Sequence, residues 1–567
     1  MGALDALVKE AQQAQRKGRA LQAMRVYRRV LGEQAGHIEA RQWMGVALYQ
    51  LGQYTRALCH LRQAAEAAGD HPTYANNLGL VYIALGEFDL ADAAFTRTQQ
   101  LRPGDRVAVR NLKVIAQRRD KLHRALLQFR STTPGMLSET EAYLRLGVQC
   151  RQRGQIEQAV ACYRRALQLA PDSALGYNRL GNVLKDQGRL DEAEQCFYEA
   201  LRINPHYHQA MHNLGTAYGM MNRAEEADEW YSRALQYDAD YGLSQFGRAH
   251  VQLVSGQFGT GWQQYEWRWQ LDQFKVPEYR QPMWDGTPLS GRTLLLRFEQ
   301  GLGDTMQFIR YAPMVKQRVG RVVFVCQERL LPLIQGASDL GIDAVIRADG
   351  DLPEFDVWVS LLSLPRLMGT TVESTPRDIP YLAADTELIN QWATRLPAGD
   401  FRVGINWSGN PKNHDNHYRS FPLFDASPLM EIAGVTLISL QKGGAARQRE
   451  AMVHAFDVHD LGPDFDEGER AFMDTAAVMQ HLDLVITCDT SIGHLAGALG
   501  VPVWLAHVPG LDWRWLHGRT DTPWYPTMRV FPQSRFGHWE NVFDAMAAEL
   551  KDVLAGQATL SDRRNRD

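Results

Sequence analysis

The sequence predicts two architectures in one chain: an N-terminal array of two-helix repeats, then a two-lobed α/β part built on parallel sheets. A glycine recurs every 34 residues through the first half. A stretch with three prolines at 272–290 then interrupts this periodicity. Beyond it, short apolar runs alternate with helical runs, which is the pattern of βαβ units.

The repeats are marked by small and large residues at fixed positions. Twelve residues after each lattice glycine comes Ala, and four residues later a large apolar residue; the glycines are Gly45, Gly79, Gly147, Gly181 and Gly215. Two helices can approach closely where one of them carries such a small residue. Proline closes three of the units, where it ends a helix. The pattern resembles the tetratricopeptide (TPR) repeat.

Weaker units extend the lattice to about eight repeats over residues 1–271. The unit at 106–139 is degenerate because Lys113 replaces the glycine, and residues 131–140 predict an irregular loop.

TPR arrays present a concave groove that binds protein segments. Asn77, Asn111 and Asn213 share one position on the inner helices. An amide donates and accepts hydrogen bonds, so a row of them could hold a peptide backbone, similar to the asparagine ladder in the TPR arm of O-GlcNAc transferases. The alternative is that Asn simply suits a solvated concave face.

Nine apolar runs after the linker at 272–290 predict strands in two sets. The first set is 293–298, 321–326, 343–346 and 356–361, and the second is 402–407, 435–441, 482–489, 501–507 and 528–531. The two sets predict Rossmann-like lobes at 291–395 and 396–555, with a cleft between them. We expect a last helix near 538–555 and a flexible tail at 556–567.

The first chemical motif, FEQGLGDTMQF (298–308), follows the first strand. Gly301 and Gly303 allow a tight strand-to-helix turn with close backbone approach. Asp304 then stands at the helix start, at the strand end where such sheets bind ligands. It could act in the cleft or only cap the helix.

The second motif is LDLVITCDTSIGHLAGALGVPVWLAH (482–507), in which a strand ends and a helix begins. A helix N-terminus binds diphosphate well, because its N–H groups are unpaired and its dipole is positive there. Thr490 and Ser491 add hydroxyl donors, Gly493 allows close approach, and His494 could donate to a leaving group. Alternatively, Thr490 or Ser491 caps the helix and His494 is a buried polar residue.

Together, the GLGD loop and the DTSxxHLAGALGxPV segment resemble glycosyltransferase family 9, the heptosyltransferases with the GT-B fold. The resemblance covers about 291–545. It implies an inverting transfer without an essential metal, with Asp304 as general base. It also implies that Thr490, Ser491, Gly493 and His494 contact the diphosphate of a nucleotide-sugar donor. No cofactor is required beyond that donor.

Without a metal, protein groups must stabilise the leaving diphosphate. Candidates follow the first strand of the second lobe: Ser408, Asn410, Lys412 and Arg419. Gln441 and Lys442 are placed to line the base or ribose. The segment Trp513–Arg514–Trp515 could form a lid or acceptor platform, or pack at the lobe interface.

Composition excludes several other classes of protein. Net charge is −4 and the pI about 6.5, so we expect no nucleic-acid partner. No run approaches about 18 apolar residues, and the polar N-terminus is not a secretory signal, so we expect no membrane span and a cytoplasmic location. Six scattered cysteines indicate reduced thiols and no metal site.

The leading hypothesis is a protein glycosyltransferase whose TPR groove holds a polypeptide acceptor, flagellin or another surface protein being one possibility. A second hypothesis is a transferase for lipopolysaccharide or another envelope glycan. A third is a non-catalytic scaffold whose cleft senses a nucleotide sugar. Homo-oligomerisation is compatible with each hypothesis, because TPR arrays often self-associate.

Overall fold

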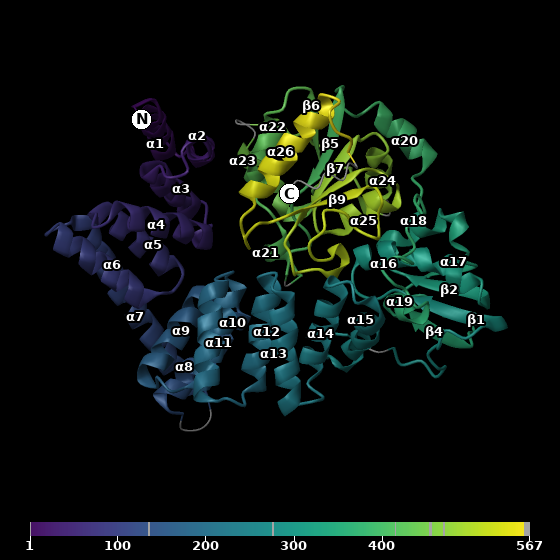
Figure 1. Cartoon of the computed structure of the whole chain (residues 1–567), viewed down its shortest axis with the longest axis horizontal. Coiled ribbons are helices and arrows are strands. Elements are labelled where there is room, and N and C mark those ends of the chain that lie inside the picture. Colours follow the sequence, from purple (N-terminus) through teal and green to yellow (C-terminus); the bar gives the residue numbers. More distant parts are fainter. Residues whose placement is uncertain are drawn as a thin grey trace. The chain divides into compact units, whose positions relative to one another are not determined.

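Helices fill the first half of the chain, and two parallel sheets with their own helices fill the second (Figure 1). This computed structural model describes residues 2–133, 137–274, 277–413, 415–452, 456–468 and 471–560. Its contacts divide the chain into two compact units, Met1–Ala217 and Tyr218–Asp567. The predicted fold class is confirmed. The predicted boundaries at 271, 290, 395 and 555 stay predictions, and most of the predicted tail, 561–567, lies outside the described residues.

In the first unit, consecutive helices pack in pairs. The pairs are α1 (Gly2–Arg16) with α2 (Ala20–Glu33), α3 (Ile38–Gln50) with α4 (Tyr54–Ala68), α5 (Pro72–Ala84) with α6 (Phe88–Leu101), α8 (Glu139–Gln152) with α9 (Ile156–Leu169), and α10 (Ala174–Asp186) with α11 (Leu190–Ile203). Helix α12 (His208–Met220) follows them.

Four of the five lattice glycines, Gly45, Gly79, Gly147 and Gly181, lie where the helices of a pair touch. A Cβ atom on Gly181 would stand 2.6 Å from Cε1 of Phe197, and one on Gly79 would stand 2.6 Å from Cζ of Phe95. Since real Cβ atoms do not approach other atoms so closely, the large residue of each pair requires glycine opposite it. The predicted close approach of the two helices is confirmed at these positions.

The degenerate unit is one unbroken helix rather than a pair. Helix α7 (Arg106–Thr132) has 27 residues, and Asp105 caps its start by accepting from Val107 N and Ala108 N at 3.0 Å. Two causes are visible in the sequence: Lys113 replaces the lattice glycine, and no Gly or Pro interrupts residues 106–132. Part of the loop expected at 131–140 is helical, and residues 134–136 lie outside the described residues.

Buried ion pairs join the repeats before α7 to those after it. Glu87 is 2% exposed and accepts hydrogen bonds from Arg189 Nη2 at 2.7 Å and from Arg164 Nε at 2.8 Å. Burial alone would raise the pKa of Glu87, but the two guanidinium groups more than offset it and hold this pKa below its usual value. Thr55 Oγ1 also donates to Gln187 O at 3.0 Å. These contacts fix the path of the first unit across the degenerate repeat.

The second unit opens with α13 (Ala224–Tyr237), α14 (Gly242–Val254), α15 (Phe258–Tyr265) and the 3₁₀ turn η1 (Glu266–Gln270). The segment between η1 and the first strand is packed against a sheet. Trp284 is 2% exposed, its N–H donates to Trp358 O at 2.8 Å, and Met283 forms a parallel bridge with Trp358. The end of the predicted linker therefore extends the edge of the first sheet.

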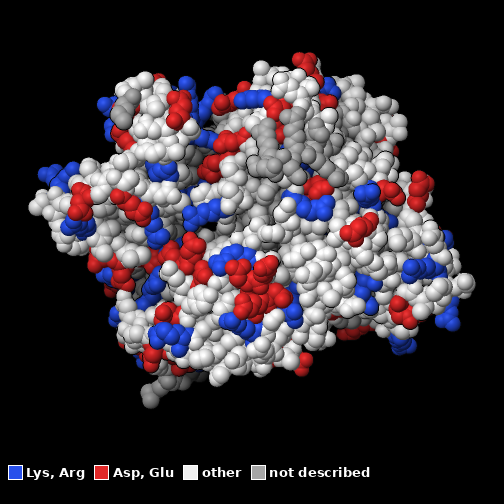
Figure 2. All heavy atoms as spheres, in the orientation of Figure 1, with Lys and Arg blue, Asp and Glu red and all other residues white. Residues whose placement is uncertain are grey.

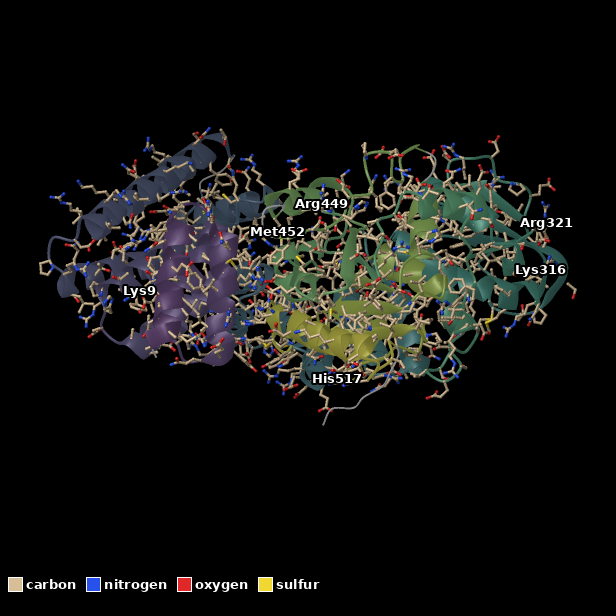
Figure 3. The ribbon with its side chains drawn as sticks, turned by 90° about the horizontal axis from the view of Figure 1, so that it is seen from above. Lys9, Lys316, Arg321, Arg449, Met452 and His517 are labelled. Atoms are coloured by element: carbon tan, nitrogen blue, oxygen red, sulfur yellow. The ribbon has the colours of Figure 1, made fainter. Side chains whose placement is uncertain are left out.

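The first sheet has four parallel strands in the order β3-β2-β1-β4. They are β1 (Leu289–Arg297), β2 (Val319–Cys326), β3 (Ala344–Arg347) and β4 (Val357–Ser360). The helices of this lobe are α16 (Leu302–Phe308), α17 (Ala312–Lys316), α18 (Leu331–Gln335), α19 (Leu364–Leu367) and α20 (Thr386–Ala393). Lys316 and Arg321, labelled in Figure 3, mark an outer part of this lobe, where Lys316 pairs with Asp343 at 2.6 Å.

The second sheet has five parallel strands in the order β6-β5-β7-β8-β9. They are β5 (Phe401–Asn406), β6 (Val435–Ser439), β7 (Leu484–Cys488), β8 (Val503–His507) and β9 (Met528–Pro532). Its helices are α21 (Asn416–Arg419), α22 (Ser427–Met430), α23 (Arg447–Met452), α24 (Met473–Met479), α25 (Ser491–Ala498) and α26 (Glu540–Leu554). All nine predicted strands are confirmed, as is the last helix.

Acidic and basic side chains lie beside one another on the face drawn in Figure 2, without a large area of one sign. Within the described ranges, no helix is both long enough and apolar enough to span a membrane.

The glycine contacts predict a matched pair of variants. Gly181→Ala places a methyl group against Phe197, so the free energy of unfolding should fall by about 1–3 kcal/mol. Gly32→Ala, on α2, meets nothing within 4 Å and should change stability little or raise it slightly. Urea denaturation followed by circular dichroism measures both variants, and equal stabilities would contradict the packing role of Gly181.

Candidate functional site

The first turns of α16 and α25 are in contact. A Cβ atom on Gly303 would lie 2.7 Å from Cδ2 of His494 and 3.4 Å from Cα of Ser491. Both helices begin directly beyond a parallel strand, α16 after β1 and α25 after β7. Residues predicted from two separate motifs are thus brought together at the carboxyl ends of two sheets, where such folds bind ligands.

Asp304 lies in the first turn of α16 and uses both carboxylate oxygens. Oδ2 accepts from Gly301 N at 2.7 Å, and Oδ1 pairs with Nη2 of Arg514. Burial raises the pKa of Asp304, while the Arg514 charge and the Gly301 N–H act in the opposite direction. The carboxylate therefore caps its helix and also faces the second lobe.

The loop before Asp304 is a tight turn in which the two glycines provide space, as predicted. Its left-handed residue is Gln300, with φ 62°, whereas Gly301 has φ −82°. A Cβ atom on Gly301 would lie 2.9 Å from Asp304 Oδ2, and one on Gly303 would meet His494. A strained non-glycine residue in such a loop is typical of functional sites.

Arg514 is a buried link between the lobes. Its Nη1 donates to Asp512 Oδ1 at 3.0 Å and Oδ2 at 2.9 Å, and its Nε donates to Gln307 at 2.6 Å. The flanking rings pack in the interior, with Trp513 4.9 Å from Trp262 and Trp515 stacked on His494 at 5.6 Å. Of the two interpretations of Trp513 and Trp515, the structure favours packing at the lobe interface.

The start of α25 is fixed by a hydrogen bond to a neighbouring strand rather than by a side-chain cap. Among the described residues no side chain caps this helix, and Thr490 instead donates to Asn406 Oδ1 at 2.9 Å. Gly493 faces the sheet, where an added Cβ atom would lie 3.2 Å from Thr487 Cγ2. Gly493 therefore allows the helix to pack on β7, and its expected role in admitting a phosphate finds no support in this geometry. Ser491 begins the helix beside Gly303.

His494 is buried and neutral. Burial lowers its pKa to about 3, and nearby Arg514 acts in the same direction. Its Nδ1 lies 3.0 Å from the hydroxyl of Tyr525, whose own pKa is raised well above its usual value. Assigning the Tyr525 proton to this bond leaves the imidazole hydrogen on Nε2. Such a tautomer can donate a hydrogen bond on the side of Gly303.

Arg419 is the cation placed beside this helix start. A Cβ atom on Gly409 would lie 3.2 Å from Arg419 Nη2 and 3.3 Å from Thr490 Cγ2, so Arg419 and Thr490 flank the same glycine. Within the described residues, the buried Nε of Arg419 has no hydrogen-bond partner. A guanidinium with unused donors next to uncapped helix N–H groups is an anion-binding arrangement.

The other predicted donor residues divide into two groups. Gln441 is 8% exposed and braces the end of β5, since its Oε1 accepts from Trp407 N at 3.0 Å and from Ser408 N at 2.8 Å. Its amide is thus used internally rather than lining a base or ribose. Lys442 Nζ pairs with the Glu467 carboxylate at 3.0 Å. Asn410 and Lys412 are exposed, and Asn410 Oδ1 accepts a hydrogen bond from Lys412 N at 3.0 Å.

Sequence reasoning missed a buried carboxyl group beside the anion site. Asp489 directly follows β7 and is 7% exposed. Burial, and after it the nearby Asp512 charge, raise its pKa to about 7, while Arg419 acts in the opposite direction. Its position at a strand end was the available signal. A carboxyl group that titrates near neutral pH is a candidate for proton transfer.

The predicted asparagine row is only partly present. Asn213 donates to Asn178 at 2.8 Å, so two neighbouring repeats place amides side by side. Asn111 lies on α7 and is 4% exposed, and Asn77 is half-buried on α5. Burial removes Asn111 from a solvated groove.

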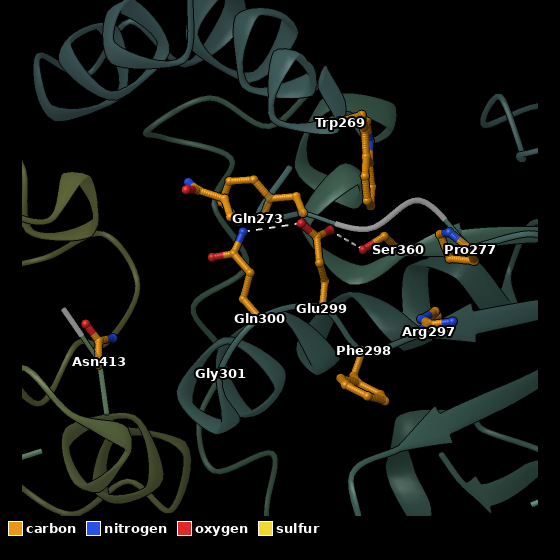
Figure 4. Close-up of a pocket in the computed structure, with 11 residues that line it drawn as sticks. Trp269, Gln273, Pro277, Arg297, Phe298, Glu299, Gln300, Gly301, Ser360 and Asn413 are labelled. Atoms are coloured by element: carbon orange, nitrogen blue, oxygen red, sulfur yellow. Dashed lines mark hydrogen bonds between the residues drawn. The ribbon is translucent and has the colours of Figure 1, made fainter. Parts of the chain in front are cut away.

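A cavity of about 560 Å³ opens beside the Gly301 loop. Its floor is Glu299, whose carboxylate binds Arg268 Nε at 2.7 Å and Nη2 at 3.0 Å and also accepts from Ser360. Figure 4 shows the Gln300 amide nitrogen directed at Glu299, with Trp269 on one side and Asn413 across the opening. Sequence reasoning missed Glu299 and Arg268, although Glu299 stands two residues after β1.

No group of three or more His, Cys, Asp or Glu side chains suited to a metal ion occurs in the described part of the chain.

Comparisons with known proteins identify the helical half. A family model described as TPR repeat matches residues 147–188, and one described as Tetratricopeptide repeat matches 172–239. The N-terminal helices are TPR repeats. A model described as Anaphase-promoting complex, cyclosome, subunit 3 matches residues 17–98. The TPR part of the predicted resemblance is confirmed. The chain therefore has a region of the type that mediates protein interactions.

Individual relatives of this chain are distant. Protein FlbA of Caulobacter vibrioides is 26% identical over 336 residues, and the chain spans about half of that protein, 56% of each. The TPR protein YrrB is 19% identical with a TM-score of 0.18, covering 38% of this chain and 95% of that one. The fragment of yeast Sti1 in its pHSP90 complex is 17% identical with a TM-score of 0.21, covering 47% and 98%.

The raised pKa of Asp489 predicts a pH-dependent stability. In the unfolded chain this carboxyl ionises near 3.8, but in the folded protein near 7. Wild type should therefore lose stability relative to Asp489→Asn as pH rises from about 4 to 7, by on the order of 4 kcal/mol. Denaturant titrations between pH 4 and 8 measure this difference. The control is Asp339→Asn, an exposed position; a constant difference for Asp489→Asn would mean that Asp489 is ionised throughout.

Proposed function

We propose that this chain is an inverting glycosyltransferase that moves a sugar from a nucleotide diphosphate donor to a hydroxyl group of a polypeptide. The observation that carries the proposal is the meeting of α16 and α25. It brings Gly303, the neighbour of Asp304, against Ser491 and His494 of an uncapped helix start that has Arg419 at its flank. The resemblance of both motifs to glycosyltransferase family 9 supports it further.

The donor diphosphate would bind at α25. Backbone N–H groups of the first turn and the Arg419 guanidinium offer hydrogen bonds and positive charge. His494, neutral and held by Tyr525, adds a donor that does not depend on pH in the neutral range. Ser491 stands at the same turn. These groups supply the charge stabilisation that a transferase without a metal needs at its leaving group.

Asp304 would act as the general base. The acceptor hydroxyl gives its proton to the carboxylate, and its oxygen forms a bond to the anomeric carbon. The bond from that carbon to the donor phosphate breaks, and the nucleoside diphosphate leaves with the electron pair. Although both Asp304 oxygens already accept one hydrogen bond each, each has a second lone pair for the proton. The raised pKa of Asp304 makes it a stronger base.

The TPR helices supply the reason to expect a protein acceptor. Repeats of this kind bind polypeptides, and a binding surface on the same chain raises the local acceptor concentration. An envelope glycan acceptor is the weaker candidate, because a net charge of −4 gives the chain no overall attraction to an anionic glycolipid.

Removing the proposed base should separate binding from turnover. Asp304→Asn should lower the rate of sugar transfer by about 10²–10⁴-fold and leave donor binding nearly unchanged. Transfer of a radiolabelled sugar measures the rate, and calorimetry measures donor binding. Asp339→Asn is the control, and an unchanged rate in Asp304→Asn would remove Asp304 from the mechanism.

The anion site predicts a loss of donor affinity. Arg419→Ala should weaken nucleoside diphosphate binding by about 10–100-fold, as expected for the loss of charge-assisted hydrogen bonds. Calorimetric titration with ADP-, UDP-, GDP- and CMP-linked sugars measures this effect and identifies the nucleotide. Arg321→Ala, an exposed arginine on β2, is the matched control. If the folded wild-type protein binds none of these donors, the transferase proposal fails.

A further inference from the structure

The cavity beside the Gly301 loop is linked to the proposed base through Gly301. Gly301 lines this cavity, and its N–H donates to Asp304 Oδ2 at 2.7 Å. A ligand in the cavity would therefore reach the base from the side of the first lobe and η1, while α25 and Arg419 belong to the second lobe. The volume of the cavity, about 560 Å³, is within the range of ligand-binding pockets in proteins.

The chemistry of its walls favours one class of occupant. Three aromatic rings, those of Trp269, Phe274 and Phe298, supply apolar contact area. The side-chain amides of Gln273, Gln300 and Asn413 stand around the opening, and Figure 4 shows the Gln300 amide oxygen turned away from Glu299. Amides both donate and accept, as a peptide backbone does.

The charges of the cavity are balanced. Arg297 and Glu299 are the charged residues that line it. Beneath them, Arg268 is fully buried and is paired with both Glu299 and Glu266, at 2.7 Å and 2.8 Å. The wall thus has no surplus of positive charge, which a phosphorylated glycolipid would need.

From this geometry we infer that the cavity is the acceptor subsite and that it binds an extended peptide segment carrying a serine or threonine. The inference rests on the proposed function and places the reacting residue here, rather than in the TPR groove. Arg268 and Tyr265, from the end of the last TPR unit, form the site with the first lobe, since Gln300 Nε2 donates to Tyr265 OH at 3.1 Å. The hydroxyl would lie at the Gly301 end and give its proton to Asp304.

A filling variant tests the subsite. Gln273→Trp adds bulk from an exposed position on the cavity wall, and Gln270→Trp adds the same bulk at an exposed position outside it. Trp269→Ala removes an aromatic wall. The probe is a library of capped seven-residue peptides with a central Ser or Thr, incubated with the full chain and analysed by affinity selection and mass spectrometry. Nucleotide-sugar binding is measured in parallel by thermal shift.

Wild type and Gln270→Trp should retain the same peptides. Gln273→Trp and Trp269→Ala should retain at least about tenfold less peptide, while their donor binding is unchanged. Equal retention in Gln273→Trp overturns the inference. The inference is also overturned if the wild-type protein binds vesicles containing phosphorylated glycolipid but retains no peptide. It is overturned as well if the wild-type protein binds the donor but retains no peptide. If retention depends on the cavity but no donor binds, the peptide site stands and the proposed function falls.

Discussion

The Arg514 guanidinium joins the two lobes through Asp304 and Gln307 on α16 and through Asp512 on its own loop. A buried cation of this kind needs at least one carboxylate partner, here Asp512 as well as Asp304, because an unpaired buried charge costs several kcal/mol. Asp304, in turn, caps the helix that places Gly303 against His494. The geometry of the candidate site, the approach of the two sheets and the start of α16 therefore depend on one network.

A second constraint comes from the last helices of the repeat array. His250 Nε2 lies 3.2 Å from Gly510 O, and Arg268 holds the carboxylate of Glu299. Trp262 packs against both Phe308 and Trp513. These helices support the loops that carry the proposed base and its arginine, which explains why they group with the α/β lobes rather than with the preceding repeats.

Sequence periodicity predicted the repeats and all nine strands because both depend on local patterns of small and apolar residues. Asp304, Ser491 and His494 were predicted to lie at the starts of helices that directly follow strands, and the structure has them there. Arg514 and Arg268 bind carboxylates that lie far away in the chain, Asp304 and Glu299, so no local pattern marks these two arginines. Gln441 was assigned to a ligand contact from its position and Gly493 from a family motif. In the structure Gln441 braces the end of β5, and Gly493 lets α25 pack on β7.

The grouping of α13–α15 with the α/β lobes has a consequence for how such a chain can be rearranged. Recombination that exchanges the repeats before α12 would join a different set of TPR repeats to an intact site. Exchange at residue 271 would replace His250, Trp262 and Arg268 together, leaving Glu299 without its counter-charge and Trp513 without its neighbour. The boundary at which this protein can be recombined would then lie inside its repeat array. Its final repeats would be exchanged together with the site that they support.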